Sequence, residues 1–283
     1  MEVILAKTAG FCFGVKKAVD TVYNEADKGG RIYTFGPIIH NEEVIRDLGS
    51  KGVEVIEDED DIDDISGGTV IIRSHGVEEK IYDRIEKRGL RLIDATCPFV
   101  KKIHGIVLRE SNSGRQVIII GSDDHPEVMG IMGWCKKTPA IVIKNEDEAW
   151  RADIAKDRPL CIVSQTTFNH DKFQDLVDIF NKRGYDVNVV DTICNATMER
   201  QTEAERLARS VDAMIVIGGR LSSNTQKLYE ICRRVLKNTQ YIQTIDDLDS
   251  AMLEGANCVG ITAGASTPNN IIEEVQNYVR INF

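Results

Sequence analysis

The segment Val117-Ile-Ile-Ile-Gly-Ser-Asp-Asp-His-Pro-Glu127 joins a run of β-branched residues to a glycine and a polar turn. A short β-branched run of this kind is typical of a buried strand in a parallel sheet. Longer helical patterns alternate with such runs along the chain, and this alternation predicts parallel α/β units.

The same pattern occurs twice more. Ile32–Phe35 is followed by Gly36 and the turn His40-Asn-Glu42, and Met214–Ile217 is followed by Gly218 and the turn Ser222-Ser-Asn224. The three glycines are spaced by 85 and 97 residues. A self-similar pattern of this length indicates an internal repeat.

A second half-unit also occurs three times, each a strand followed by a small, hydroxyl-rich turn: Val70–Gly76, Cys161–Thr167 and Cys258–Gly264. After the first two copies a further strand leads to Cys97 and Cys194, whereas the third copy has none. The missing strand is found at the N-terminus, where Val3 begins a run that leads to Cys12. We therefore expect three similar α/β domains, comprising 13–96, 97–193, and 194–283 completed by 1–12.

Cys12, Cys97 and Cys194 are also spaced by 85 and 97 residues, so they occupy one equivalent position in the three units. Ligands of open parallel sheets bind beyond the carboxyl ends of the strands, and helix N-termini there favour thiolates. If the domains surround a pseudo-threefold axis, the three thiols converge on it. We expect one 4Fe–4S cluster with three cysteine ligands and one open iron; a single zinc is the competing occupant.

The other four cysteines are interpreted as core residues. Cys161 and Cys258 fall in strand runs, and Cys135 and Cys232 are expected inside helices. His104 and His170 do not follow the repeat and are interpreted as surface or structural residues.

Composition limits the classes of partner. The 283 residues carry a net charge of −10, which argues against nucleic acid or an anionic membrane as the main partner. No apolar run is long enough to span a bilayer and no signal peptide is evident, so we expect a cytoplasmic protein. The sequence has neither a dinucleotide fingerprint nor a P-loop, so another protein is the expected source of electrons.

The polar turns predict an anion pocket. Hydroxyls, amides and imidazoles at helix starts suit a phosphate or diphosphate. A reduction that expels water also needs a proton donor, and the repeat offers two equivalent carboxylates, Glu42 and Glu127. Sequence physics alone does not choose between them.

Together these residues resemble the family of 4-hydroxy-3-methylbut-2-enyl diphosphate reductases of the non-mevalonate isoprenoid pathway. The matching motifs cover essentially the whole chain: Ala9-Gly-Phe-Cys-Phe-Gly-Val-Lys16, Ser74-His-Gly76, Ala95-Thr-Cys-Pro98, His125-Pro-Glu-Val128, Gln165-Thr-Thr167, Ser222-Ser-Asn224 and Thr262-Ala-Gly-Ala-Ser266. One departure is Leu221, where the family usually has asparagine.

The resemblance implies a trefoil of three domains around one 4Fe–4S cluster held by Cys12, Cys97 and Cys194. It implies Glu127 as the proton donor and an external electron donor of the ferredoxin or flavodoxin type. The products would be isopentenyl and dimethylallyl diphosphate plus water. The residues implied to bind the substrate, mostly at its diphosphate, are His40, His75, His125, Thr166, Ser222, Ser223, Asn224 and Ser266.

Two other classes fit part of the pattern. A redox-neutral cluster lyase or synthase of the quinolinate synthase type is similar in plan, but the His-Pro-Glu and Ser-Ser-Asn turns favour the reductase. A non-enzymatic cluster-based metabolite sensor should carry an appended binding region, and the repeats leave no residues for one.

Overall fold

The computed structural model describes all 283 residues, and the chain separates into two compact units. Lys17–Ile38 and Leu48–Cys194 form what we call the two-sheet unit; Met1–Lys16, Ile39–Asp47 and Asn195–Phe283 form the one-sheet unit. None of the helices is long and apolar enough to cross a membrane.

The first sheet of the two-sheet unit is parallel, with strand order β3-β2-β4-β5. Its strands are β2 (Ile32–Phe35), β3 (Val53–Ile56), β4 (Thr69–Ile72) and β5 (Arg91–Asp94). The short helix α3 (Asp61–Asp64) and α4 (Glu79–Lys87) contribute Ile62, Ile81 and Ile85 to the core on one face. The helices α1 (Phe13–Ala26) and α2 (Glu42–Ser50) each run from one unit into the other.

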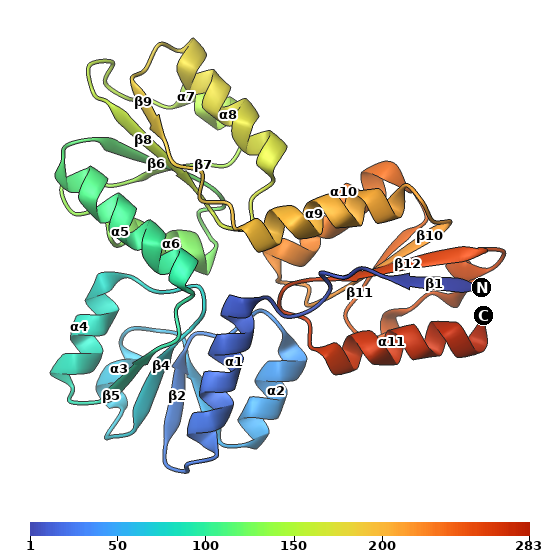
Figure 1. Ribbon diagram of the computed structural model, residues 1–283. Helices are drawn as coiled ribbons and strands as arrows, with labels where there is room; N and C mark the ends of the chain where they lie inside the picture. Colours follow the sequence, from blue (N-terminus) through green and yellow to red (C-terminus); the bar gives the residue numbers. More distant parts are fainter. The chain divides into compact units, whose positions relative to one another are not determined.

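The second sheet of this unit repeats the first, with parallel order β7-β6-β8-β9. Its strands are β6 (Gln116–Ile120), β7 (Ile141–Ile143), β8 (Leu160–Ser164) and β9 (Val187–Val189). Figure 1 shows α5 (Pro98–Asn112) and α6 (Pro126–Met132) on one side, and α7 (Glu146–Arg151) and α8 (His170–Lys182) on the other. Both faces of β6 and β8 are covered, which is why these strands are mostly apolar.

The one-sheet unit contains the third copy, with parallel order β1-β12-β10-β11. Its strands are β1 (Glu2–Leu5), β10 (Ala213–Ile217), β11 (Thr239–Ile242) and β12 (Cys258–Ala263). The helices α9 (Asn195–Ala208) and α10 (Ser223–Val235) cover one face, and α11 (Asn269–Asn282) covers the other (Figure 1). Between β11 and β12 lie two short 3₁₀ turns, η1 (Ile245–Asp247) and η2 (Ser250–Leu253).

These sheets confirm the α/β class, the threefold repeat and the role of the N-terminal strand. Read outward from the same equivalent strand, all three have one order, and β1 occupies the position that β5 and β9 hold in the other two. Glu2 pairs with Cys258 and Leu5 with Ile261, so the first strand completes the last sheet. The expected boundaries at 13, 97 and 194 stay a prediction.

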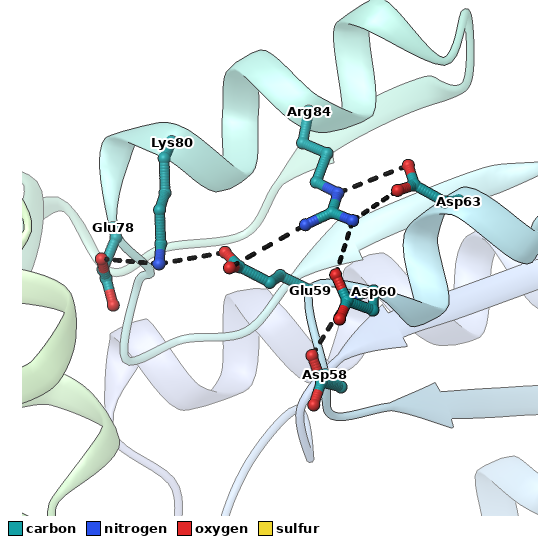
Figure 2. Close-up of polar contacts among 7 residues, drawn as sticks. All are labelled: Asp58, Glu59, Asp60, Asp63, Glu78, Lys80 and Arg84. Atoms are coloured by element: carbon teal, nitrogen blue, oxygen red, sulfur yellow. Dashed lines mark hydrogen bonds and ion pairs between the residues drawn. The ribbon is translucent and has the colours of Figure 1, made fainter.

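The acidic stretch after β3 is bound to α4. Figure 2 shows Arg84 facing Asp60 and Asp63, with Lys80 between Glu59 and Glu78. Arg84 lies 2.7 Å from the Asp60 carboxylate, and Lys80 lies 3.0 Å from that of Glu59. Most of these groups are well exposed, so the stretch is a solvated, ion-paired surface, and each pair contributes little to stability.

Candidate functional site

The three equivalent cysteines share one local geometry. Each stands at the start of a helix: Cys12 before α1, Cys97 as the N-cap of α5, and Cys194 before α9. The backbone N–H of each donates to a carbonyl in the turn after the neighbouring strand. The acceptors are Ala265 at 3.4 Å for Cys12, Ser74 at 3.0 Å for Cys97 and Thr166 at 3.0 Å for Cys194. The repeat therefore holds these thiols in the same way three times.

Of the other four cysteines, Cys161 and Cys232 are buried, whereas Cys135 and Cys258 are partly exposed. Cys161 and Cys232 are fully buried, and burial raises the pKa of each thiol to about 12. Burial also raises the pKa of Cys135 to about 11. Cys135 lies just beyond the end of α6 rather than inside a helix, because that helix ends at Met132. These groups stay protonated at neutral pH and are poor metal ligands.

All seven cysteines are thiols, and the three at helix starts are partly exposed. Thiolates are the usual ligands of iron–sulfur clusters, and a helix start stabilises negative charge on sulfur. The donor set thus fits the cluster expected for it, and the buried cysteines do not.

Glu127, in the first turn of α6, is held by the turn after β8. Its carboxylate accepts hydrogen bonds from the backbone N–H of Thr166 at 2.6 Å and from the Thr166 hydroxyl at 2.7 Å. Only 2% of the Glu127 residue surface is exposed. Burial raises the pKa of this carboxyl, and the opposing effect of the Thr166 hydrogen bonds is smaller. Glu127 is therefore biased toward the protonated form that a general acid needs.

Two histidines belong to the same neighbourhood as this carboxyl. His125 is the N-cap of α6, and its Nδ1 accepts a hydrogen bond from the Glu127 N–H at 3.1 Å. A neutral ring that accepts at Nδ1 carries its proton on Nε2. The His75 ring, in the turn after β4, packs edge-on against His125 with 5.4 Å between ring centroids. The two-sheet unit thus brings His75, His125, Glu127 and Thr166 into one neighbourhood.

The one-sheet unit gathers a second polar group around the start of α10. Ser222 is the N-cap of α10, and its hydroxyl accepts from the Thr225 N–H at 3.3 Å. The Ser266 hydroxyl contacts Ser222 Oγ at 3.3 Å and the His40 carbonyl at 3.1 Å. Ser223 and Asn224 form the first turn of this helix, whose N-terminus is a favourable place for an anion.

Glycines permit the close approach in this group. A side chain at Gly264 would meet the Thr225 hydroxyl, and one at Gly219 would lie 2.6 Å from the His40 carbonyl oxygen. The turns that carry Ser266, Ser222 and His40 can pack together only because these positions have no Cβ.

Two amides in this unit are buried without a full set of hydrogen bonds. Asn224 is 6% exposed, and neither Oδ1 nor Nδ2 has a partner. Asn41 is 1% exposed; its Oδ1 accepts from the Val44 N–H at 3.2 Å, but its Nδ2 has no partner. Buried polar atoms without partners are costly and are a sign of a ligand site.

Asn41 was not among the residues implied to bind substrate. Its signal in the sequence was its position, since it is equivalent in the repeat to Pro126 and Ser223. Leu221, the departure from the family pattern, is 69% exposed and precedes the N-cap of α10.

Glu42 has another partner. Its carboxylate accepts a hydrogen bond from the Gln243 side chain at 2.9 Å, and it is only partly buried. Of the two carboxylates equivalent in the repeat, Glu127 is therefore the one with the deeply buried environment of a general acid. His104 is 3% exposed and packs in the core, whereas the His170 side chain is 39% exposed.

The chain is similar to known proteins over nearly its whole length. The family model described as LytB protein matches residues 3–280. The 4-hydroxy-3-methylbut-2-enyl diphosphate reductase of Caldanaerobacter subterraneus subsp. tengcongensis is 44% identical over 97% of this chain and 95% of its own length. That of Clostridioides difficile is 43% identical over 99% of each chain.

Two solved structures are also similar. The E-1-hydroxy-2-methyl-but-2-enyl-4-diphosphate reductase of Plasmodium falciparum superposes with a TM-score of 0.90 at 30% identity, over 99% of this chain and 87% of that one. A structure described as (E)-4-hydroxy-3-methyl-but-2-enyl diphosphate reductase gives a TM-score of 0.70 at 39% identity, over 99% of both chains. With its matching family model, full-length relatives and shared fold, the chain belongs to the LytB protein family.

Proposed function

We propose that this chain is a 4-hydroxy-3-methylbut-2-enyl diphosphate reductase. It removes the allylic hydroxyl of its substrate with two electrons and two protons. The products are isopentenyl and dimethylallyl diphosphate, plus one water. The names of its relatives support the substrate, and the observation that carries the chemistry is the buried carboxyl of Glu127 under the Thr166 hydrogen bonds.

Cys12, Cys97 and Cys194 would hold the iron–sulfur cluster, here taken as 4Fe–4S with one iron left open. Such a group supplies electrons one at a time and Lewis acidity at the open iron. The position of each cysteine at the start of a helix supports this proposal, and three thiolate ligands would leave a fourth iron for substrate.

The diphosphate would bind the one-sheet unit at the start of α10. Ser222, Ser223, Asn224 and Ser266 offer hydroxyl and amide donors there, and the helix N-terminus adds a positive potential. The Asn224 amide would then gain the partners that it lacks in the protein alone. His40, His75 and His125 would complete the binding set, with the Nε2–H of His125 as a donor.

Glu127 would supply a proton to the departing hydroxyl. The Thr166 hydroxyl donates a hydrogen bond to the Glu127 carboxylate. This contact orients the Glu127 side chain, and Thr166 can donate the same bond to the carboxylate that remains after the proton has been transferred. Loss of the hydroxyl as water consumes one proton, and protonation of the reduced allyl carbon consumes the second. The two electrons come from outside the chain, and a donor of the ferredoxin or flavodoxin type in the cytoplasm would deliver them.

The test is anaerobic turnover with reduced methyl viologen. Cluster-reconstituted protein is mixed with the dye and 4-hydroxy-3-methylbut-2-enyl diphosphate, and the loss of dye colour is followed. Substrate-dependent oxidation of two dye equivalents per five-carbon diphosphate product is expected. Conversion of other phosphorylated substrates without dye oxidation would instead favour a redox-neutral lyase, and binding without conversion would favour a sensor.

A further inference from the structure

Trp134, just beyond the end of α6, joins three elements of the two-sheet unit. Its indole N–H donates to the Val77 carbonyl at 3.0 Å. Its ring stacks on His104 of α5, with ring centroids 5.0 Å apart and an interplanar angle of 16°. The Tyr82 ring of α4 packs edge-on against it at 6.0 Å.

The turn after β4 is closely packed against the His104 ring of this stack. Gly76 has φ +73°, and a side chain there would place its Cβ 2.7 Å from Cε1 of His104. On the opposite side, a side chain at Gly130 of α6 would come within 3.3 Å of the Gly76 backbone. Movement of either aromatic ring would therefore be transmitted to the turn.

His104 acts in the stack as a neutral aromatic surface. It is 3% exposed, and burial lowers its pKa to about 4. A neutral imidazole packs parallel to an indole without a buried charge.

Three of the elements that the stack joins, namely the turn after β4, α5 and α6, carry a residue of the proposed site. His75 precedes Gly76 in the turn, Cys97 is the N-cap of α5, and Glu127 lies in the first turn of α6. The Cys97 N–H also bonds the Ser74 carbonyl of the same turn. The stack thus connects three elements, each of which carries a residue of the proposed site near one of its ends.

We propose that Trp134, stacked on His104, is a positioning residue that fixes the turn bearing His75 relative to the helices that begin at Cys97 and His125. The proposal depends on the proposed function only for the identity of the substrate. The role of Trp134 in holding the turn does not depend on it. A misplacement of about 1 Å in such a site costs on the order of 100-fold in rate.

The test compares Trp134→Ala and Trp134→Phe with Trp150→Ala. Trp150 is the only other tryptophan and is 51% exposed, so its variant is the matched control. Trp134→Phe keeps an aromatic ring on His104 and loses only the bond to Val77. The readouts are iron per chain, kcat and KM per cluster-loaded chain, and hydrogen exchange of the peptide that covers Ser74–Val77.

We expect Trp134→Ala to keep its iron, to raise KM, and to lower kcat/KM about 10- to 100-fold. Exchange at Ser74–Val77 should rise in step, with Trp134→Phe intermediate and Trp150→Ala unchanged. Wild-type kcat and KM per cluster in the Trp134 variants would overturn the proposal, even if their melting temperature fell. So would unchanged exchange at the turn. If Trp134→Ala fails to fold, Trp134→Phe decides the question by the same two readouts.

If the proposed function itself is wrong, the outcome differs from a failure of the Trp134 proposal. The wild-type protein would then oxidise no dye with the five-carbon substrate. The exchange experiment would still show whether Trp134 holds the turn.

Discussion

At the scale of single residues, some buried polar groups of the site have hydrogen-bond partners and others have none. Glu127 is buried and bonded twice to Thr166, whereas the Asn224 amide is buried with no bond at all. Both arrangements oppose stability in the isolated protein, because burial of a carboxyl or of an unpaired amide costs free energy. Each would be explained by a ligand that arrives with complementary groups.

The buried carboxyl predicts a pH-dependent stability. The pKa of Glu127 is raised in the folded protein above its ordinary value of 4.5. The folded state therefore binds the proton more tightly than the unfolded state does. The contribution of the protonated Glu127 to the free energy of unfolding is therefore complete below pH 4.5. It is lost as the pH rises through the pKa of Glu127 in the folded protein. Urea unfolding of wild type and Glu127→Gln should diverge across this range, with wild type losing up to about 1.4 kcal/mol per pH unit relative to the variant. Parallel curves at pH values above 4.5 would contradict the assignment.

The unpaired amide predicts a separation of stability from affinity. Asn224→Ala removes buried groups that have no partner, so the free energy of unfolding should stay constant or rise by about 1 kcal/mol. Substrate affinity should fall about 10-fold or more, because a hydrogen bond to a charged group is lost. Calorimetric titration and urea unfolding measure the two quantities.

The control for this variant is Asn169→Ala. Asn169 is the N-cap of α8 and accepts from the Lys172 N–H at 3.0 Å. Its loss should cost about 1 kcal/mol of stability and leave affinity unchanged. The same pattern of effects in both variants would show that Asn224 is only a structural residue.

At the scale of elements, the repeated unit is a parallel strand, a polar turn and a helix start. The repeat spacing predicted the three sets of strands and the equivalent positions of the three cysteines. In the structure each copy has the same backbone hydrogen bond at its cysteine. It could not choose between Glu42 and Glu127, since their difference lies in contacts with Gln243 and Thr166. Nor could it find the stack of Trp134 on His104, because the two residues are 30 positions apart and follow no period.

This unit predicts which cysteines matter for iron. Cys97→Ser replaces a proposed ligand at a helix start and should abolish the cluster, seen as loss of iron and of visible absorbance. Cys232→Ser changes a buried core thiol of α10 and should keep the iron, with a stability loss of about 1–3 kcal/mol. Retention of a full cluster by Cys97→Ser would exclude it as a ligand.

At the scale of the whole molecule, the chain closes its last sheet with its first strand. Strand β1 pairs with β12, which precedes the C-terminal helix α11. This could be predicted because the third repeat ends without a fourth strand while the N-terminus has an unassigned one. What the repeat could not predict is the division into two compact units, since the three copies share one pattern but two of their sheets fall in one unit and the third in the other.

Closure by β1 predicts an asymmetric response to truncation. Removal of Met1–Leu5 takes away the partly buried Val3, Ile4 and Leu5 and exposes the edge of β12, so it should lower the free energy of unfolding by about 3 kcal/mol or more. Removal of 281–283 takes away Ile281, which is 81% exposed, and should cost under about 1 kcal/mol. Equal losses from both ends would contradict the importance of this closure.

The proposed function depends most on the buried carboxyl of α6, which would donate a proton during reduction of a diphosphate. The most direct test is turnover of Glu127→Gln, reconstituted anaerobically, beside Glu42→Gln as the matched carboxylate. We expect Glu127→Gln to keep its iron and its affinity for substrate while losing on the order of 100- to 10,000-fold in kcat, and Glu42→Gln to turn over normally. Wild-type turnover by Glu127→Gln with a full cluster would contradict the account.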